Sequence, residues 1–338
     1  MIKKLLYIPI IAICCSCSKS SDTEKYRNKS DHIIFVKEKI NEINFQEVLI
    51  SQYARLYLIN DYLLIADGRS LDKLIHIFDK KSFRYIAGVA DRGQGPGDIA
   101  NIGFVGVNES DNTFYVNDHG KQKIFGYRLD SVLANPLYMP EVKMTMNEKQ
   151  FPSKYQFIND TLLMGVTIVP AGNSGFDHAT AKINMNTGEI IPILNKHPKV
   201  TRKRISFAAS PEHGIYVECY NYHDLMTIYD LNGNLKYNLY GRKWNDKTTN
   251  RFGYYEKVLF CKDKIVALYS DAKNRYSDAE NSSPTQFLIF NTDGDYIQTL
   301  ETEFSILDFC YDMDNHRIIM HLNDEIQFAC LYLAGLVE

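Results

Sequence analysis

The stretch that decides the fold is Phe114-Tyr115-Val116-Asn117-Asp118-His119-Gly120-Lys121-Gln122-Lys123-Ile124, an apolar strand, a polar turn and the start of a second strand. The same unit recurs elsewhere in the chain. Leu63–Asp67 leads to Ile77–Asp79, and Ile215–Glu218 leads to Ile228–Asp230. Internal repeats of this kind predict an array of similar supersecondary units.

Most other segments of the chain also have the pattern of a β-strand. The 23 Tyr and 18 Phe side chains favour pleated, half-buried surfaces, and no segment shows a long apolar stripe at helical spacing. The strand-like segments fall into sets of four, with tight turns such as Asn232-Gly233 and Asp293-Gly294 between the third and fourth members. The sequence therefore predicts an all-β protein.

The last of these sets, within 304–333, has only three strand-like segments. A ring of sheets must close, because an unpaired edge strand invites aggregation. His32–Glu38 is apolar and strand-like, so we expect it to fill the vacancy from the other end of the chain. Removal of residues 1–16 from the 338 leaves 322, or about 54 for each of six units. The predicted fold is a six-bladed β-propeller of four-stranded antiparallel blades over residues 32–338.

The amino terminus has the features of a bacterial export signal. Lys3 and Lys4 precede the apolar run Leu5–Ile13, which is too short for a membrane span of about 20 residues. Cys17 follows a small residue, as expected at a lipoprotein cleavage site. We expect Cys17 to carry lipid, with an ordinary cleaved signal as the alternative.

These features predict a signal peptide over residues 1–16 and a flexible tether over residues 17–31. They place the protein in the bacterial cell envelope, held by lipid, and we expect the outer membrane, facing the periplasm or the medium. The formal net charge of −3 and the lack of a basic patch argue against nucleic-acid binding. The expected partners are the membrane and an unidentified glycan, peptide or envelope protein, and the expected state is a monomer.

Four cysteines of the predicted propeller lie in apolar strand-like segments at spacings that match no zinc pattern: Cys219, Cys261, Cys310 and Cys330. We interpret them as buried free thiols that act as small apolar residues. An exported protein also allows one disulfide. Cys261 and Cys310 are then the best pair, since the repeat places both near the ends of neighbouring strands.

Two stretches carry a family resemblance. Gly93-Gln94-Gly95-Pro96-Gly97-Asp98-Ile99 and the degraded strand-turn-strand core Val116–Ile124 resemble the six-bladed, NHL-like and TolB-like propeller lipoproteins common in Bacteroidetes bacteria. In that family a Gly-x-Gly-Pro-Gly-acidic loop follows an outer strand and introduces the next blade. The resemblance implies an exported propeller with no settled activity.

Signatures of catalysis are missing from the sequence. The glycines of 93–97 invite comparison with a phosphate loop, but Pro96 removes an amide and no Lys-Ser/Thr ending follows. Gly172-Asn173-Ser174-Gly175 lacks the full nucleophile pattern, and no His-Glu-x-x-His occurs. We therefore predict no catalytic residues.

Binding residues are expected on one face of the propeller. Links between second and third strands share a face with links between blades, and long loops on a rigid scaffold tend to carry binding residues. We call this the loop-rich face. Its candidate residues are Asp67, Arg69, Asp91, Arg92, Asp118, His119, Asp177, His178, Tyr220, Tyr222, His223, Asp271, Arg275 and Tyr276.

Three of these links carry a histidine beside an aspartate: His119, His178 and His223. Such groups converging on a central channel would suit a divalent metal that lowers the pKa of bound water. Solvated loop histidines are the commoner case, so no cofactor is predicted and a metal is the weaker hypothesis. We expect a non-catalytic binding module, and keep a metal-dependent hydrolase or lactonase-like enzyme as the alternative.

Overall fold

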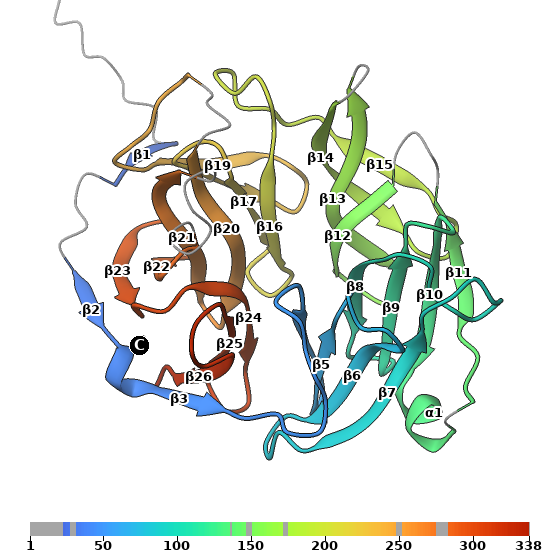
Figure 1. Cartoon of the computed structure of the whole chain (residues 1–338). Helices are drawn as coiled ribbons and strands as arrows, with labels where there is room; N and C mark the ends of the chain where they lie inside the picture. The colour runs from blue at the N-terminus through green and yellow to red at the C-terminus, as the bar shows by residue number, and fades with distance from the viewer. Residues whose placement is uncertain are drawn as a thin grey trace, which may run out of the picture.

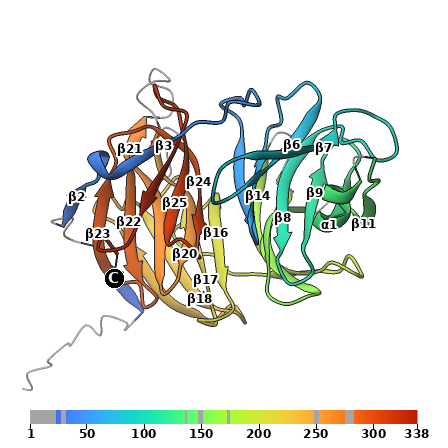
Figure 2. The ribbon, with the colours of Figure 1, turned by 90° about the horizontal axis from the view of Figure 1, so that it is seen from below.

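The structure is a computed structural model, and it describes residues 23–27, 32–135, 137–146, 151–171, 175–247, 252–274 and 283–337. Six sheets stand around a central axis, and each has a core of four antiparallel strands (Figures 1 and 2). The predicted all-β, six-bladed propeller is thereby confirmed. Cys17 and the proposed signal peptide lie outside the described residues.

The first three blades follow each other along the chain. Blade one contains β4 (Arg55–Ile59), β5 (Tyr62–Ala66), β6 (Lys73–Asp79) and β7 (Tyr85–Asp91). Blade two contains β8 (Ile102–Asn108), β9 (Thr113–Asp118), β10 (Lys123–Arg128) and β11 (Glu141–Thr145), with the short helix α1 (Leu129–Ala134) before β11. Blade three contains β12 (Phe151–Phe157), β13 (Leu162–Ala171), β14 (Gly175–Asn184) and β15 (Ile190–Ile193).

The last three blades each take a strand from the amino-terminal segment. Blade four contains β16 (Ile205–Ser210), β17 (Ile215–Tyr220), β18 (Leu225–Asp230) and β19 (Leu235–Tyr240), with β1 (Glu24–Tyr26) added at its edge. Blade five contains β20 (Phe252–Cys261), β21 (Lys264–Asn274), β22 (Gln286–Asn291) and β23 (Tyr296–Glu301), with β2 (Ile33–Phe35) added. Blade six contains β24 (Ile306–Asp312), β25 (Arg317–Leu322), β26 (Phe328–Tyr332) and β3 (Ile40–Ile43).

The ring closes through the amino-terminal segment, as predicted, but through a different strand. The expected closing segment His32–Glu38 was wrong, because its strand β2 pairs in parallel with β23 of blade five. The 3-10 turn η1 (Lys37–Lys39) redirects the chain, and β3 then pairs antiparallel with β26. Val36 explains the choice, since it is fully buried in the core between blades five and six. Figure 1 shows this blue segment along the outside of the late blades.

Apolar side chains fill the spaces between adjacent blades. Six buried clusters occur in the described residues, one at each blade-to-blade interface. The first strand of each blade contacts the first strands of its neighbours, so these six inner strands surround the central channel. The turns Asn232-Gly233 and Asp293-Gly294 have the predicted positive φ, at 90° for Gly233 and 81° for Gly294.

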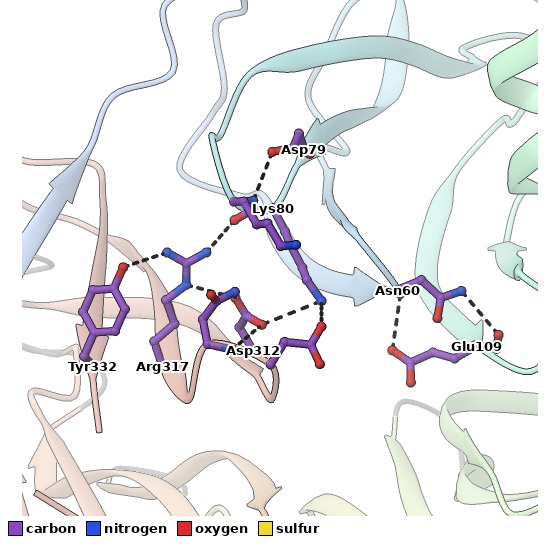
Figure 3. Close-up of polar contacts among 10 residues, drawn as sticks. Asn60, Asp79, Lys80, Glu109, Asp312, Arg317 and Tyr332 are labelled. Atoms are coloured by element: carbon purple, nitrogen blue, oxygen red, sulfur yellow. Dashed lines mark hydrogen bonds and ion pairs between the residues drawn. The ribbon is translucent and has the colours of Figure 1, made fainter. Parts of the chain in front are cut away.

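A buried polar cluster seals the interface where the ring closes (Figure 3). We call Lys80, Asp312 and Arg317 the closing joint. The Arg317 Nε donates to Asp312 Oδ2 at 2.9 Å, and another guanidinium nitrogen donates to the Lys80 carbonyl of blade one. The Lys80 ammonium lies 3.8 Å from Asp312 and 2.5 Å from the exposed Asp314. All three residues of the joint are buried, so each charge has a partner where water is excluded.

The four propeller cysteines are buried free thiols, which confirms the preferred interpretation and gives no Cys261–Cys310 disulfide. Burial raises the pKa of the Cys261 thiol, and Cys310 adds to the effect. Such thiols are poor nucleophiles because the thiolate is the reactive form. Separately, none of the helices that the structure describes has the length and apolarity needed to cross a bilayer.

Candidate functional site

The loop-rich face is built as expected in blades one and two. The backbone amide of Arg92, in the link between these blades, donates to the Asp72 carbonyl in the link between β5 and β6 at 3.0 Å. The Lys121 ammonium, between β9 and β10, donates to the Asp98 carbonyl at 2.7 Å. The glycine-rich loop over 93–97 joins β7 to β8, as predicted for a blade-to-blade turn.

Asp67 is fastened into the scaffold. Its buried carboxylate accepts hydrogen bonds from the amide and the hydroxyl of Ser51, both at 2.7 Å, and from the Arg69 amide at 2.8 Å. Burial alone would raise the pKa of Asp67, but the hydrogen bonds from Ser51 and Arg69 outweigh it and lower the pKa. This carboxylate therefore positions the link that enters blade one.

Asp118 plays the same part in blade two. Its buried carboxylate accepts from the amides of Ala100 at 2.8 Å, Asn101 at 3.0 Å, Gly120 at 2.8 Å and Lys121 at 3.2 Å. Ala100 and Asn101 belong to the link from blade one, so the strand-end aspartate joins a blade to the link that leads into it. The repeated apolar-Asp motif is architectural at both positions.

The other charged candidates of blade one contact neighbouring strands and links of the same blade. The exposed Arg69 lies over the Tyr53 ring, 5.0 Å from its centroid. Asp91 forms an ion pair with Lys73. Arg92 donates from Nε to the Ser70 carbonyl at 2.8 Å and from Nη2 to the Gly68 carbonyl.

The three predicted loop histidines have separate surroundings. His119 packs edge-on against Phe151, with ring centroids 5.5 Å apart. It also lies over Gly103, so closely that a Cβ added to this glycine would be 2.2 Å from the His119 Nε2. The buried His223 bonds through Nδ1 to the Asn245 carbonyl at 3.2 Å. The Nδ1 of His178 accepts from the Ile205 amide at 3.1 Å, which leaves the neutral ring protonated at Nε2.

The protonation of these histidines follows their burial. Burial lowers the pKa of His119 and of His223. Burial, Arg204 and Lys154 together lower the pKa of His178 to about 4. Across the described ranges, no three His, Cys, Asp or Glu side chains are grouped as a metal ion would require. The metal hypothesis thus lacks a ligand set in this part of the chain.

Asp224 and Tyr220 lie inside blade four. The buried Asp224 carboxylate accepts from the Tyr269 hydroxyl at 3.1 Å and the Lys243 amide at 3.0 Å, and lies 3.6 Å from Arg27 Nη2. Tyr220 is buried and directs its hydroxyl to Glu218, 3.4 Å away. Arg27 comes from the amino-terminal segment, so Asp224 fastens that segment to the propeller.

Of the remaining candidates, Asp177 lies in blade three, Tyr222 in blade four and Asp271 in blade five. Tyr222 and Asp177 are partly exposed neighbours of Arg204, which stacks on the ring of Phe176 at 3.4 Å from its centroid. Asp271 belongs to β21, but its side chain lies outside the described residues. Arg275 and Tyr276 also lie outside them.

Four charged residues that we did not predict come from the inner strands. Arg55 begins β4, Lys154 lies in β12, Lys257 in β20 and Asp308 in β24. We call this group the channel mouth. The sequence contains only a weak signal, namely charged side chains within inner strands that are mostly apolar or aromatic. This signal is easily missed, because a charged residue in an alternating strand pattern is normally interpreted as lying on the solvent-facing side of the sheet.

Comparisons with known proteins agree with this architecture. Residues 40–159 match the DUF5128 family, described as a 6-bladed beta-propeller. No curated protein matches the sequence. A solved member of the DUF4221 family from Bacteroides vulgatus has a TM-score of 0.63 and 11% identity, covering 87% of this chain and 95% of that chain.

Two further solved structures are similar at comparable identity. A protein from Bacteroides fragilis described as exported has a TM-score of 0.53 and 11% identity, covering 88% of each chain. A gluconolactonase from Xanthomonas campestris has a TM-score of 0.51 and 10% identity, covering 80% of this chain and 82% of that chain. At these identities the likeness shows the fold alone.

Proposed function

We propose that this protein is a lipid-anchored module of the bacterial cell envelope that binds a ligand or partner through its loop-rich face, without catalysis of its own. The observation that supports this proposal is that several of the predicted aspartates and histidines hydrogen-bond to the propeller itself, each in a different place. Asp118 accepts from backbone amides, and Asp67 accepts from two amides and the Ser51 hydroxyl. His178 and His223 hydrogen-bond to backbone groups. Groups held in this way suit a rigid binding platform better than proton transfer.

The proposed location in the cell envelope rests on the amino-terminal sequence. Lys3, Lys4 and the apolar run Leu5–Ile13 support export, and Cys17 supports lipidation. Similarity to an exported Bacteroides fragilis protein is consistent with this location. Labelling of growing cells with a palmitate analogue should mark the wild-type chain but not Cys17→Ser. Equal labelling of both chains would move the anchor elsewhere, and absence of labelling in the wild type would remove it.

The binding role is tested with the full chain purified in a non-ionic detergent. A ligand that binds only the folded state raises its melting temperature. We expect a shift with at least one member of a panel of envelope glycans and peptides, and none with duplex DNA. A panel without any shift would count against a binding module and leave a purely structural envelope component.

A metal-dependent hydrolase of the lactonase type is the second candidate. It is favoured by fold similarity to a gluconolactonase and by the histidines of the loop-rich face. Elemental analysis of the purified chain decides between the two functions. Stoichiometric metal, together with lactone hydrolysis lost in His178→Asn and His119→Asn, would establish the enzyme, whereas metal-free chain without activity would favour the binding module.

A further inference from the structure

Three of the four charged residues of the channel mouth lie beside β-bulges of inner strands. The strand pairing shifts between Pro152 and Lys154 in β12, and between Tyr255 and Lys257 in β20. It shifts again before Asp308 in β24. A bulge bends its strand and re-aims a side chain, and such features are frequent next to functional sites. Bulges in three inner strands therefore place the charges of the channel mouth.

Two of the four charges neutralise each other. The Lys257 ammonium lies 2.7 Å from Asp308 Oδ1, and Asp308 Oδ2 accepts from the Leu56 amide at 2.8 Å. Asp308 is nearly fully buried by these contacts. Both oxygens of this carboxylate thus already have a partner.

Arg55 has only weak partners. Its Nη1 lies 3.4 Å from the Ala54 carbonyl and 3.5 Å from the Leu307 carbonyl, at the limit of a hydrogen bond. The Arg55 side chain is exposed. It pairs in register with Ala66, next to Asp67, so it lies where the channel opens onto the loop-rich face.

The exposed Lys154 has neither a hydrogen bond nor an ion pair in the part of the chain that the structure describes. Its electrostatic neighbours are Lys257, Asp308, Arg55 and Glu256. These belong to blades five, six and one, whereas Lys154 belongs to blade three. A side chain of blade three reaches all of those blades only across the channel. Water reaches the ammonium, yet burial by the channel walls and then Lys257 lower its pKa.

On its own side, Lys154 lies near the His178 ring. Its neighbour His178 is kept neutral by burial, by Arg204 and by Lys154 itself, with a smaller effect from Lys203. Glu256 is the nearby carboxylate besides Asp308, and it has contacts of its own. Two cations and two carboxylates thus surround an ammonium that forms an ion pair with neither carboxylate, and an added anion would stabilise it.

We propose, building on the binding role of the loop-rich face, that the channel mouth binds an anionic ligand whose carboxylate or phosphate is held by Lys154 and Arg55. Lysine and arginine donate charge-assisted hydrogen bonds to such groups. The chain as a whole has a net charge of −3. The channel mouth is instead locally cationic and would attract an anion. The neutral His178 ring next to Lys154 supplies a donor at Nε2 for an adjoining hydroxyl or oxyanion.

The experiment measures melting temperature and affinity of the full chain in non-ionic detergent at fixed ionic strength. The probes are inorganic phosphate, D-galacturonate and D-galactose, the last as the neutral counterpart of the second. We expect a concentration-dependent shift with at least one anion and none with galactose. A shift with galacturonate alone identifies a carboxylate ligand, and a shift with phosphate alone identifies a phosphoryl ligand. Equal response to all three probes, or to none, would overturn the proposal.

Lys154→Met is the decisive variant, with Lys143→Met as matched control, because Lys143 is exposed on the outer strand β11. Loss of one charge-assisted hydrogen bond should weaken the Kd about 10-fold or more in Lys154→Met, and the control should bind as wild type. Lys154→Arg should retain most of the affinity. Unchanged affinity in Lys154→Met would refute the site.

A second measurement covers the case in which Lys154→Met does not fold. Reductive ¹³C-methylation of the lysines gives each ammonium a resonance, and the Lys154 signal is assigned by its absence in Lys154→Arg. We expect this signal to move on anion addition while the Lys143 signal stays. A static Lys154 signal at saturating anion would overturn the inference. Binding of a neutral glycan or peptide in the same panel would leave the proposed binding function intact.

Discussion

The closing joint and the channel mouth both gather cations, and they treat them in opposite ways. At the closing joint, Arg317 and Lys80 are buried around Asp312, with the Arg317 Nε 2.9 Å from the carboxylate (Figure 3). At the channel mouth, Lys154 is exposed and unpaired within the described residues. At the buried closing joint every charged side chain has a partner, whereas at the solvent-accessible channel mouth the Lys154 ammonium has no ion-pair partner. The difference separates a structural cluster from a site with unused binding capacity.

Asp312→Ala should have the largest effect, because it leaves two cations of the closing joint without their shared carboxylate. Loss of one partner from a buried ion pair costs about 3–5 kcal/mol. We expect the free energy of unfolding to fall by that amount in urea titrations. The control is Asp314→Ala, which removes an exposed partner of Lys80 and should change stability far less, because exposed ion pairs are screened by water. Equal losses in the two variants would contradict the structural role of the joint.

Asp118→Ala should follow in magnitude. The carboxylate serves the amides of Ala100, Asn101, Gly120 and Lys121, and leaving such groups unsatisfied costs about 2–3 kcal/mol. Asp118→Asn keeps one oxygen acceptor and should recover part of the loss. The measurement is urea unfolding of the three chains under one condition. Wild-type stability in Asp118→Ala would show that the strand-end aspartate is not a joint and restore it as a ligand-binding candidate.

Acid should destabilise the protein through His178. Its pKa is about 4 in the folded chain and about 6.5 when unfolded, so the unfolded state takes up the proton first as pH falls. Stability from this group is fully present above pH 6.5, declines between 6.5 and 4, and then levels off. We expect a loss of about 2–3 kcal/mol by pH 4.5.

His178→Asn is the matched variant for this titration, because the Asn Oδ1 can accept the Ile205 amide in place of Nδ1. Other buried histidines also titrate, so the informative quantity is the difference between the two chains. Urea unfolding at pH 7.5 and pH 4.5 should show a smaller acid loss in the variant. An identical loss in both chains would mean that His178 does not have a depressed pKa.

The fold could be predicted from the sequence because the pattern that specifies a blade is repeated along the chain. The strand-turn-strand unit and the missing fourth strand of the last set gave six blades and closure by the amino terminus. The closing segment was misplaced because strand pattern does not choose a pairing partner. Ile40–Ile43 is short and half polar, whereas His32–Glu38 looks more like a strand. The burial of Val36 between blades five and six decided the matter.

The candidate site was less readable, for two physical reasons. A carboxylate after a strand has the same sequence signature whether it faces water or, like Asp67 and Asp118, the amides of a neighbouring link. A bulge shifts by one residue which side chains enter the channel, and nothing in Pro152-Ser153-Lys154 marks the shift. The loop-rich face was therefore predictable, whereas Lys154 became visible only with three other blades in place around it.

Lys154→Met should have the smallest effect on the unliganded protein, and its sign is what matters. Removing a partnerless ammonium near Lys257 and Arg55 relieves repulsion, so we expect the free energy of unfolding to stay level or rise by about 0.5 kcal/mol at low salt. Salt screens this repulsion, and the gain should shrink between about 20 mM and 500 mM NaCl. A structural lysine would behave in the opposite way. A clear loss of stability in Lys154→Met, without salt dependence, would show that the ammonium is paired in the native protein and that the channel mouth resembles the closing joint.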